Sequence, residues 1–130
     1  MAMARCSTAA LFVIVFSATA LSSTVSGQVT GGRLVGGEAA WNSPAFDYQA
    51  WADGITFHIG DELIFQYDIG IHNVVVADSP EAFEQCRITP NYGVYDGGFD
   101  RLVMNDPGTY YFMCEYSCLD NMKFKVTPIY

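Results

Sequence analysis

Short runs of apolar, β-branched and aromatic residues recur along the chain after residue 30, and glycine, proline, asparagine and aspartate separate them. Such runs, bounded by turn residues, are typical of β-strands. The pattern predicts strands at residues 33–35, 55–59, 62–67, 73–77, 101–104, 109–113 and 122–126. In 62–67 and 122–126 every second residue is apolar, which indicates one buried face. Residues 73–77 are almost all valine, which indicates burial on both faces.

Two segments depart from the strand pattern. Residues 78–85 begin with Asp78-Ser79-Pro80, and this capping chemistry predicts one or two helical turns. Trp41 and Trp51 lie in a segment that contains proline and alanine, which we expect to form helical turns over one end of the fold, with both indoles in the core. The pattern as a whole predicts an all-β, Greek-key sandwich or barrel with one or two short helices.

The N-terminal segment has the features of a secretory signal peptide. Arg5 supplies a positive charge, residues 9–21 form an apolar run, and Val25 and Gly27 suit a cleavage site before Gln28. A membrane anchor is the alternative, but a spanning helix needs roughly 20 apolar residues, more than this run provides. We therefore expect a signal peptide at 1–27 and one secreted, extracellular domain at 28–130. The C-terminus lacks the apolar tail of a lipid-anchor signal.

Acidic residues dominate the predicted domain. All 14 acidic residues and five basic residues follow Gly27, which gives the domain a formal net charge of −9. This charge argues against nucleic acids and anionic membranes as partners and favours a basic partner; we expect a monomer. No serine lies in a glycine-rich elbow, the chain has two histidines, and Asp61-Glu62 follows a turn. We therefore expect a protein that is not an enzyme and has no catalytic residues.

An odd number of cysteines remains once the signal peptide, with Cys6, is removed. Cys86, Cys114 and Cys118 would then lie in an oxidising compartment, where one disulfide and one unpaired thiol are expected. The unpaired thiol could be a metal ligand, an intermolecular disulfide partner or an inert buried residue. The cysteine count does not decide between these roles.

Soft metal ligands lie near the ends of predicted strands. Cys114 ends one strand, Met122 begins the last one, and His72 lies at the entrance of the valine-rich strand. A thiolate, an imidazole and a thioether that converge at one end of a β-sandwich are typical of a type 1 copper site. The alternative is that His72 is a turn residue, Met122 belongs to the core and Cys114 is inert. Spacing alone does not separate these interpretations.

Several motifs, taken together, resemble the plant phytocyanins, and among these the plantacyanin type. The resemblance covers essentially the whole predicted domain. Its motifs are Val35-Gly36-Gly37 with Trp41, Trp51 before Gly54-Ile-Thr-Phe57, Ile59-Gly60-Asp61-Glu-Leu-Ile-Phe65, His72-Asn73-Val74-Val75, Cys86, Pro107-Gly108 before Tyr110-Tyr-Phe-Met-Cys114, and Cys118 with Met122. The resemblance implies a cupredoxin fold that binds one copper ion and transfers single electrons.

The same resemblance implies roles for individual residues. His72, Cys114 and Met122 would be copper ligands, and Cys86 and Cys118 would form the disulfide. The rival pairing, Cys114 with Cys118, would leave Cys86 free.

This sequence departs from the family pattern at the remaining copper ligand. The residue before the second loop cysteine is histidine in the family and Ser117 here. Three residues separate Cys114 from Cys118, where the family has five, and the usual Pro-Gly is absent. His58 lies beyond the opposite end of the strand that precedes His72, too far to replace the missing ligand.

Two functional hypotheses follow from this departure. The first is a copper-binding electron carrier of the cell exterior, with at most a His, Cys and Met ligand set and an unidentified extracellular redox partner. The second is a copper-free cell-wall or surface interaction module of the early-nodulin-like type.

Overall fold

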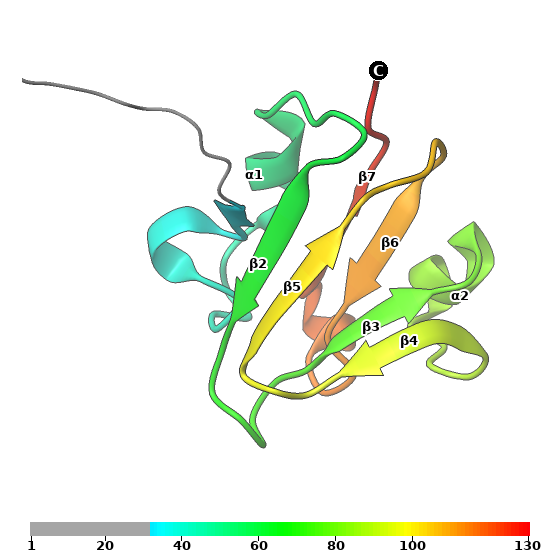
Figure 1. Ribbon diagram of the computed structural model, residues 1–130. Helices are drawn as coiled ribbons and strands as arrows, with labels where there is room; N and C mark the ends of the chain where they lie inside the picture. The colour runs from blue at the N-terminus through cyan, green and yellow to red at the C-terminus, as the bar shows by residue number, and fades with distance from the viewer. Residues whose placement is uncertain (1–31) are drawn as a thin grey trace, which may run out of the picture. The chain divides into compact units, whose positions relative to one another are not determined.

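Two β-sheets lie face to face in the computed structural model, which describes residues 32–130 (Figure 1). The first sheet has the strand order β1-β2-β5, with β1 at Arg33–Leu34, β2 at Glu62–Gln66 and β5 at Phe99–Val103. The second has the order β4-β3-β6-β7, with β4 at Asn91–Tyr95, β3 at Val74–Ala77, β6 at Tyr110–Met113 and β7 at Lys123–Val126. The predicted signal peptide and its cleavage site lie outside the described residues.

The strand pairing is that of an open sandwich. β1 pairs with β2 in parallel, and every other pair of neighbouring strands is antiparallel. Successive strands β2 and β3 lie in different sheets, as do β4 and β5, so the chain crosses between the sheets. The all-β prediction is confirmed, and of the two predicted forms the described strands adopt the sandwich and do not close into a barrel.

Aromatic side chains fill the space between the sheets. Trp41 is fully buried and its ring lies 5.3 Å from that of Phe65 and 5.7 Å from that of Phe124. Trp51 is partly buried and packs edge-on against Phe124. Trp41 is therefore in the core as expected, whereas Trp51 lies at its margin. Burial of such large rings supplies much of the driving force for folding a domain of this size.

Short helices cover the ends and one side of the sheets. α1 (Tyr48–Asp53) begins where the Asp47 carboxylate accepts a hydrogen bond from Ala50 N, and it packs against β7. α2 (Pro80–Gln85) is capped by the Ser79 hydroxyl, which confirms the helix predicted within 78–85. Two single 3-10 turns, η1 (Gly37–Ala39) and η2 (Cys118–Asp120), complete the described elements. No helix within residues 32–130 is long and apolar enough to cross a membrane.

One predicted strand is absent and one observed strand was not predicted. Residues 55–59 do not form a strand, because their only ladder contact is an isolated bridge between His58 and Ile129. β4 was not predicted, because Pro90, Gly93 and the following Asp96-Gly97-Gly98 give Asn91–Tyr95 the composition of a loop. The remaining strands lie within two residues of their predicted positions.

Candidate metal centre

A tight turn after β2 places His72 inside the protein. The backbone N–H groups of Ile71 and His72 both donate to the carbonyl oxygen of Asp68, at 3.1 and 3.2 Å. His72 then leads directly into β3, and only 5% of its surface is exposed. These backbone hydrogen bonds hold the turn, and the imidazole that follows it is buried.

A short closed loop presents Cys114 and Met122 next to each other. Cys114 follows β6 directly, and its N–H donates to the carbonyl oxygen of Met122 at 3.1 Å. Ser117 closes the loop from inside, since its N–H donates to Cys114 and its carbonyl oxygen accepts from Met122. Cys114 and Met122 are both fully buried. The three residues between the two loop cysteines are therefore enough to form an ordered loop.

The imidazole and the thiol meet in the interior. His72 Nδ1 lies 3.4 Å from Cys114 Sγ, although the two residues are 42 positions apart in the sequence. Two donor atoms that share one ion at about 2.0–2.3 Å each lie roughly 3–4 Å apart, so this pair has the separation of co-ligands. Burial lowers the pKa of His72, and the nearby Asp68 only partly opposes this, which favours the neutral imidazole that a metal requires.

Asn73 and Glu115 lock the two halves of the site together. The Asn73 amide donates to Glu115 Oε1 at 3.0 Å, and Glu115 N–H donates to Asn73 Oδ1 at 2.9 Å. The Trp41 indole N–H donates to the carbonyl oxygen of Asn73 at 2.8 Å. The sequence predicted no role for Asn73 or Glu115. Its one indication was that each directly follows a predicted copper ligand.

The position of the missing histidine offers little to a metal. Ser117 is 8% exposed and precedes η2 without capping it through its side chain. His58, the second histidine, is exposed and lies before β2, at the opposite end of that strand from His72. Within residues 32–130 no group of three or more His, Cys, Asp or Glu residues could hold a metal ion. Neither Ser117 nor His58 therefore supplies a second imidazole beside His72 and Cys114.

A disulfide anchors the loop to the end of α2. Cys86, at the end of α2, is bonded to Cys118, the pairing that the phytocyanin resemblance implies, and Cys114 remains a free, buried thiol. Lys123 reinforces the same junction, because its ammonium donates to the carbonyl oxygen of Phe83 at 2.8 Å. The rival pairing of Cys114 with Cys118 does not occur.

Comparisons with known proteins agree with this architecture. Residues 41–122 match the model of the plastocyanin-like domain family. The chain is 33% identical to the basic blue protein of Cucumis sativus over 98 residues, which cover 74% of this chain and 97% of that protein. It is 37% identical to the stellacyanin of Toxicodendron vernicifluum over 84 residues, covering 62% of this chain and 78% of that protein.

Solved structures show the same similarity. Cucumber basic protein, a blue copper protein, aligns with a TM-score of 0.68 and 32% identity, over 76% of this chain and all of that one. The family match, the extent of these alignments and the cupredoxin fold lead to one conclusion. The chain belongs to the phytocyanins, the plastocyanin-like family of blue copper proteins that transfer electrons.

Proposed function

We propose that this phytocyanin is a secreted protein whose copper site is reduced to His72, Cys114 and Met122, and that it binds copper(I) without forming a blue copper(II) centre. The proposal rests on one observation above all, the 3.4 Å separation of His72 Nδ1 and Cys114 Sγ in a buried setting. Ser117, where the family has its second histidine, supports the absence of the blue centre.

The chemistry of the three residues supports this choice of oxidation state. Thiolate and thioether ligands select copper(I), whereas a blue copper(II) centre uses two imidazoles and a thiolate in one plane. Copper bound here would supply one-electron chemistry. The residues would contribute a neutral imidazole, a thiol that must lose its proton to bind, and a shell that keeps water away.

The same proposal covers where the protein acts and which kind of partner it has. The predicted signal peptide at 1–27 favours export to the cell exterior, and the absence of catalytic residues from the sequence pattern favours a role other than catalysis. The formal charge of −9 after Gly27 favours a basic extracellular redox or cell-wall partner over nucleic acid. We propose that the protein acts there as a monomer.

A visible spectrum combined with a metal analysis tests the proposal directly. We expect protein purified with excess copper to be colourless, with up to one copper per chain and no electron paramagnetic resonance signal from copper(II). The copper is supplied as copper(I), because copper(II) would take an electron from the Cys114 thiolate and the oxidised sulfur would be lost as a ligand. An intense blue band from the unmodified protein would overturn the reduced-site proposal. Protein that stays metal-free in excess copper would favour the copper-free interaction module instead.

Rebuilding the loop distinguishes a missing ligand from a lost site. Ser117→His alone should not restore the blue colour, because the loop remains two residues shorter than the family pattern. Ser117→His together with two inserted loop residues should restore it. The control is the same rebuilt loop carrying Cys114→Ser, which should remain colourless. If the rebuilt loop binds no copper, then His72, Cys114 and Met122 are not arranged around a metal.

A further inference from the structure

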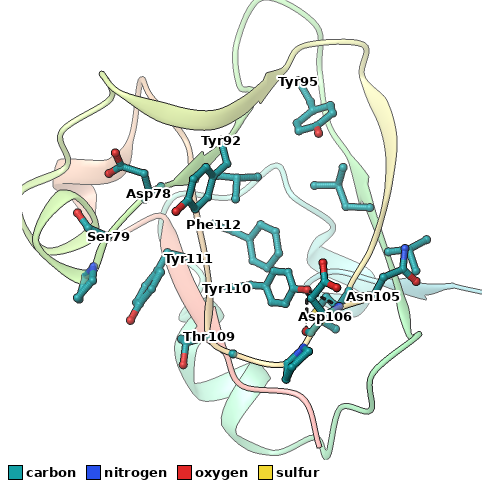
Figure 2. Close-up of a pocket in the computed structure, with 18 of the residues that line it drawn as sticks. Asp78, Ser79, Tyr92, Tyr95, Asn105, Asp106, Thr109, Tyr110, Tyr111 and Phe112 are labelled. Atoms are coloured by element: carbon teal, nitrogen blue, oxygen red, sulfur yellow. Dashed lines mark hydrogen bonds between the residues drawn. The ribbon is translucent and has the colours of Figure 1, made fainter. Parts of the chain in front are cut away.

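A cavity of about 680 Å³ opens between the two sheets, where β5 faces β3, β4 and β6 (Figure 2). Its deepest lining residues, Phe112 and Met104, are almost fully buried. Tyr110 forms one wall, and its ring lies nearly parallel to that of Phe112 at 6.2 Å. Ligand sites typically have volumes of about 300–1,000 Å³, so the cavity is large enough for a ligand. None of the candidate copper ligands lines it, so it is separate from the metal centre.

A β-bulge in β4 brings two further tyrosines to this cavity. The pairing of β4 with successive residues of β3 steps from Gly93 to Asn91, so Tyr92 is an extra residue in β4. Residues three apart in a regular strand point to opposite faces of the sheet, yet Tyr92 and Tyr95 both line the cavity (Figure 2). A bulge re-aims a side chain in this way. Tyr92 is 76% exposed, so a large aromatic ring lies at the rim and is open to a partner.

Tyrosine hydroxyls at the cavity are available to a ligand. The hydroxyl of Tyr110 is occupied, since it donates to the carbonyl oxygen of Asp106 at 2.9 Å and accepts from the N–H of that residue at 3.0 Å. The hydroxyls of Tyr92, Tyr95 and Tyr111 form no hydrogen bond with any residue of 32–130. A ligand that fits the cavity should therefore have an apolar surface for the rings and acceptor atoms for these hydroxyls.

The charge around the cavity favours a basic ligand. Arg101, the single basic residue of the lining, is already paired with Glu62 at 3.0 Å. Asp106 is exposed beside Tyr110 (Figure 2). The chain after Gly27 carries a formal net charge of −9. An acidic ligand would be repelled, whereas one that carries lysine or arginine would be attracted.

We propose that this cavity binds a proline-rich segment of a partner protein, in the polyproline II conformation and carrying lysine or arginine. Proline-rich segments dock in aromatic grooves, and polyproline II has no internal hydrogen bonds, so its carbonyl oxygens can accept from the tyrosine hydroxyls. A preformed polyproline II segment also loses little conformational entropy on binding. An added β-strand would instead need a regular row of unpaired backbone groups along β4, which the bulge at Tyr92 interrupts.

The inference rests on the basic partner of the proposed function and does not depend on copper. Because no copper ligand lines the cavity, the segment should bind equally to copper-loaded and copper-free protein. A failure to bind would therefore leave the copper(I) proposal standing, and a failure to bind copper would leave this one standing.

Three matched peptides and one glycan test the proposal by isothermal titration. The probe is a peptide of three Lys-Pro-Pro repeats, and the comparisons are three Glu-Pro-Pro repeats, three Lys-Ser-Gly repeats and cellohexaose. At about 0.15 M salt, where exposed charges are largely screened, we expect saturable binding of the Lys-Pro-Pro peptide and at least tenfold weaker binding of the others. Equal binding of the two lysine peptides would mean attraction by charge alone and would overturn the proposal. Binding of cellohexaose without the Lys-Pro-Pro peptide would overturn it in favour of a glycan site.

Tyrosine variants locate the binding. Tyr92 and Tyr116 are both exposed, at 76% and 61%, and only Tyr92 lines the cavity. Tyr92→Ala should weaken binding of the Lys-Pro-Pro peptide about tenfold, and Tyr92→Phe, which loses the hydroxyl alone, roughly two- to fivefold. Tyr116→Ala is the control and should leave the affinity unchanged. Equal losses in Tyr92→Ala and Tyr116→Ala would show that the cavity is not the site.

A second pair of variants tests the charge at the rim. Asp106 and Asp120 are both exposed, and only Asp106 lines the cavity. Asp106→Asn should weaken binding of the Lys-Pro-Pro peptide roughly two- to threefold, the effect of one exposed ion pair, and Asp120→Asn should not change it. Equal losses in the two variants would mean that the net charge of the protein attracts the peptide, with no site at the cavity.

Discussion

Asn73 connects three parts of the candidate metal centre. It exchanges two hydrogen bonds with Glu115, next to Cys114, and its carbonyl oxygen accepts from the Trp41 indole. Asn73 itself follows His72 directly, so these bonds hold the imidazole and the thiol near each other. The arrangement of His72 and Cys114 thus depends on hydrogen bonds within the protein, and it does not require a second histidine ligand.

Gly36 and Gly37 offer a controlled comparison of backbone strain with steric clash. Both have positive φ, +79° and +58°, where an L side chain costs roughly 1–2 kcal/mol. A Cβ at Gly36 would also stand 2.6 Å from the Ala40 carbonyl oxygen, whereas one at Gly37 would meet nothing within 4 Å. We expect Gly37→Ala to lower the free energy of unfolding by about 1 kcal/mol and Gly36→Ala by clearly more. Urea unfolding measures both, and equal losses would contradict the role of the clash.

Tyr67 should make the free energy of unfolding fall as the pH rises into the alkaline range. Its hydroxyl carries one proton, and the Asp100 carboxylate and the Tyr95 carbonyl oxygen are its two acceptors. Burial, followed by the hydrogen bond to Asp100, raises the pKa of Tyr67 well above its ordinary value of about 10. The folded state therefore keeps the proton that the unfolded state loses, so this contribution is complete below about pH 10 and is lost as the pH rises further.

Tyr67→Phe isolates that contribution. The variant should be about 1–2 kcal/mol less stable at pH 8, because Asp100 and the Tyr95 carbonyl oxygen lose a donor. Between about pH 10 and 11, however, it should lose less stability than the unmodified protein, since it lacks the titrating hydroxyl. Unfolding midpoints over this range measure the difference, and parallel curves for the two proteins would exclude Tyr67 as the source.

At the scale of the elements, the disulfide between Cys86 and Cys118 links α2 to η2. Cys86 caps α2, Cys118 begins η2, and the bond closes a chain segment with a sequence separation of 32. For a loop of this length the chain-entropy model gives a stabilisation of about 3.5–4 kcal/mol. We expect Cys86→Ser with Cys118→Ser to lower the free energy of unfolding by about this amount. Thermal and urea unfolding measure it, and a loss below about 1 kcal/mol would contradict the entropic account.

The strands that sequence reasoning found are those with strong local patterns. β2 and β7 alternate apolar and polar residues, and β3 is rich in valine, so their burial is visible in the sequence. β4 is an edge strand with a central glycine, and its pairing with β3 is a long-range contact that composition does not reveal. Residues 55–59 have a strand-like composition but find only Ile129 as a partner, so they remain irregular.

The candidate site was predictable to a similar extent. His72, Cys114 and Met122 could be proposed because each lies at a strand end and carries a soft or borderline metal ligand. The resemblance to the phytocyanins added the disulfide between Cys86 and Cys118. The bonds of Asn73 with Glu115 and the cavity between the sheets depend on side chains from distant segments, and no local motif encodes them.

Across the whole molecule, the net charge and the exposed apolar side chains have opposite effects on self-association. Ile69 and Ile71, in the turn before His72, are 70% and 58% exposed. Tyr116 and Leu119, in the loop that contains Ser117, are 61% and 91% exposed. Apolar side chains of this size favour association when they gather on a surface. The net negative charge opposes association through mutual repulsion of the molecules.

This balance predicts self-association that depends on pH. At pH 7.5 the carboxylates are ionised, and we expect a monomer in size-exclusion chromatography with light scattering. Near pH 4.3, the isoelectric point that the full sequence gives, many carboxylates are protonated, so repulsion is largely lost and larger species should appear. Ile69→Ser with Leu119→Ser should suppress them at pH 4.3 and leave the monomer at pH 7.5 unchanged, because these side chains are exposed and support no core packing. A stable dimer at pH 7.5 would contradict the repulsion argument. Equal association of the variant and the unmodified protein at pH 4.3 would show that other surfaces are responsible.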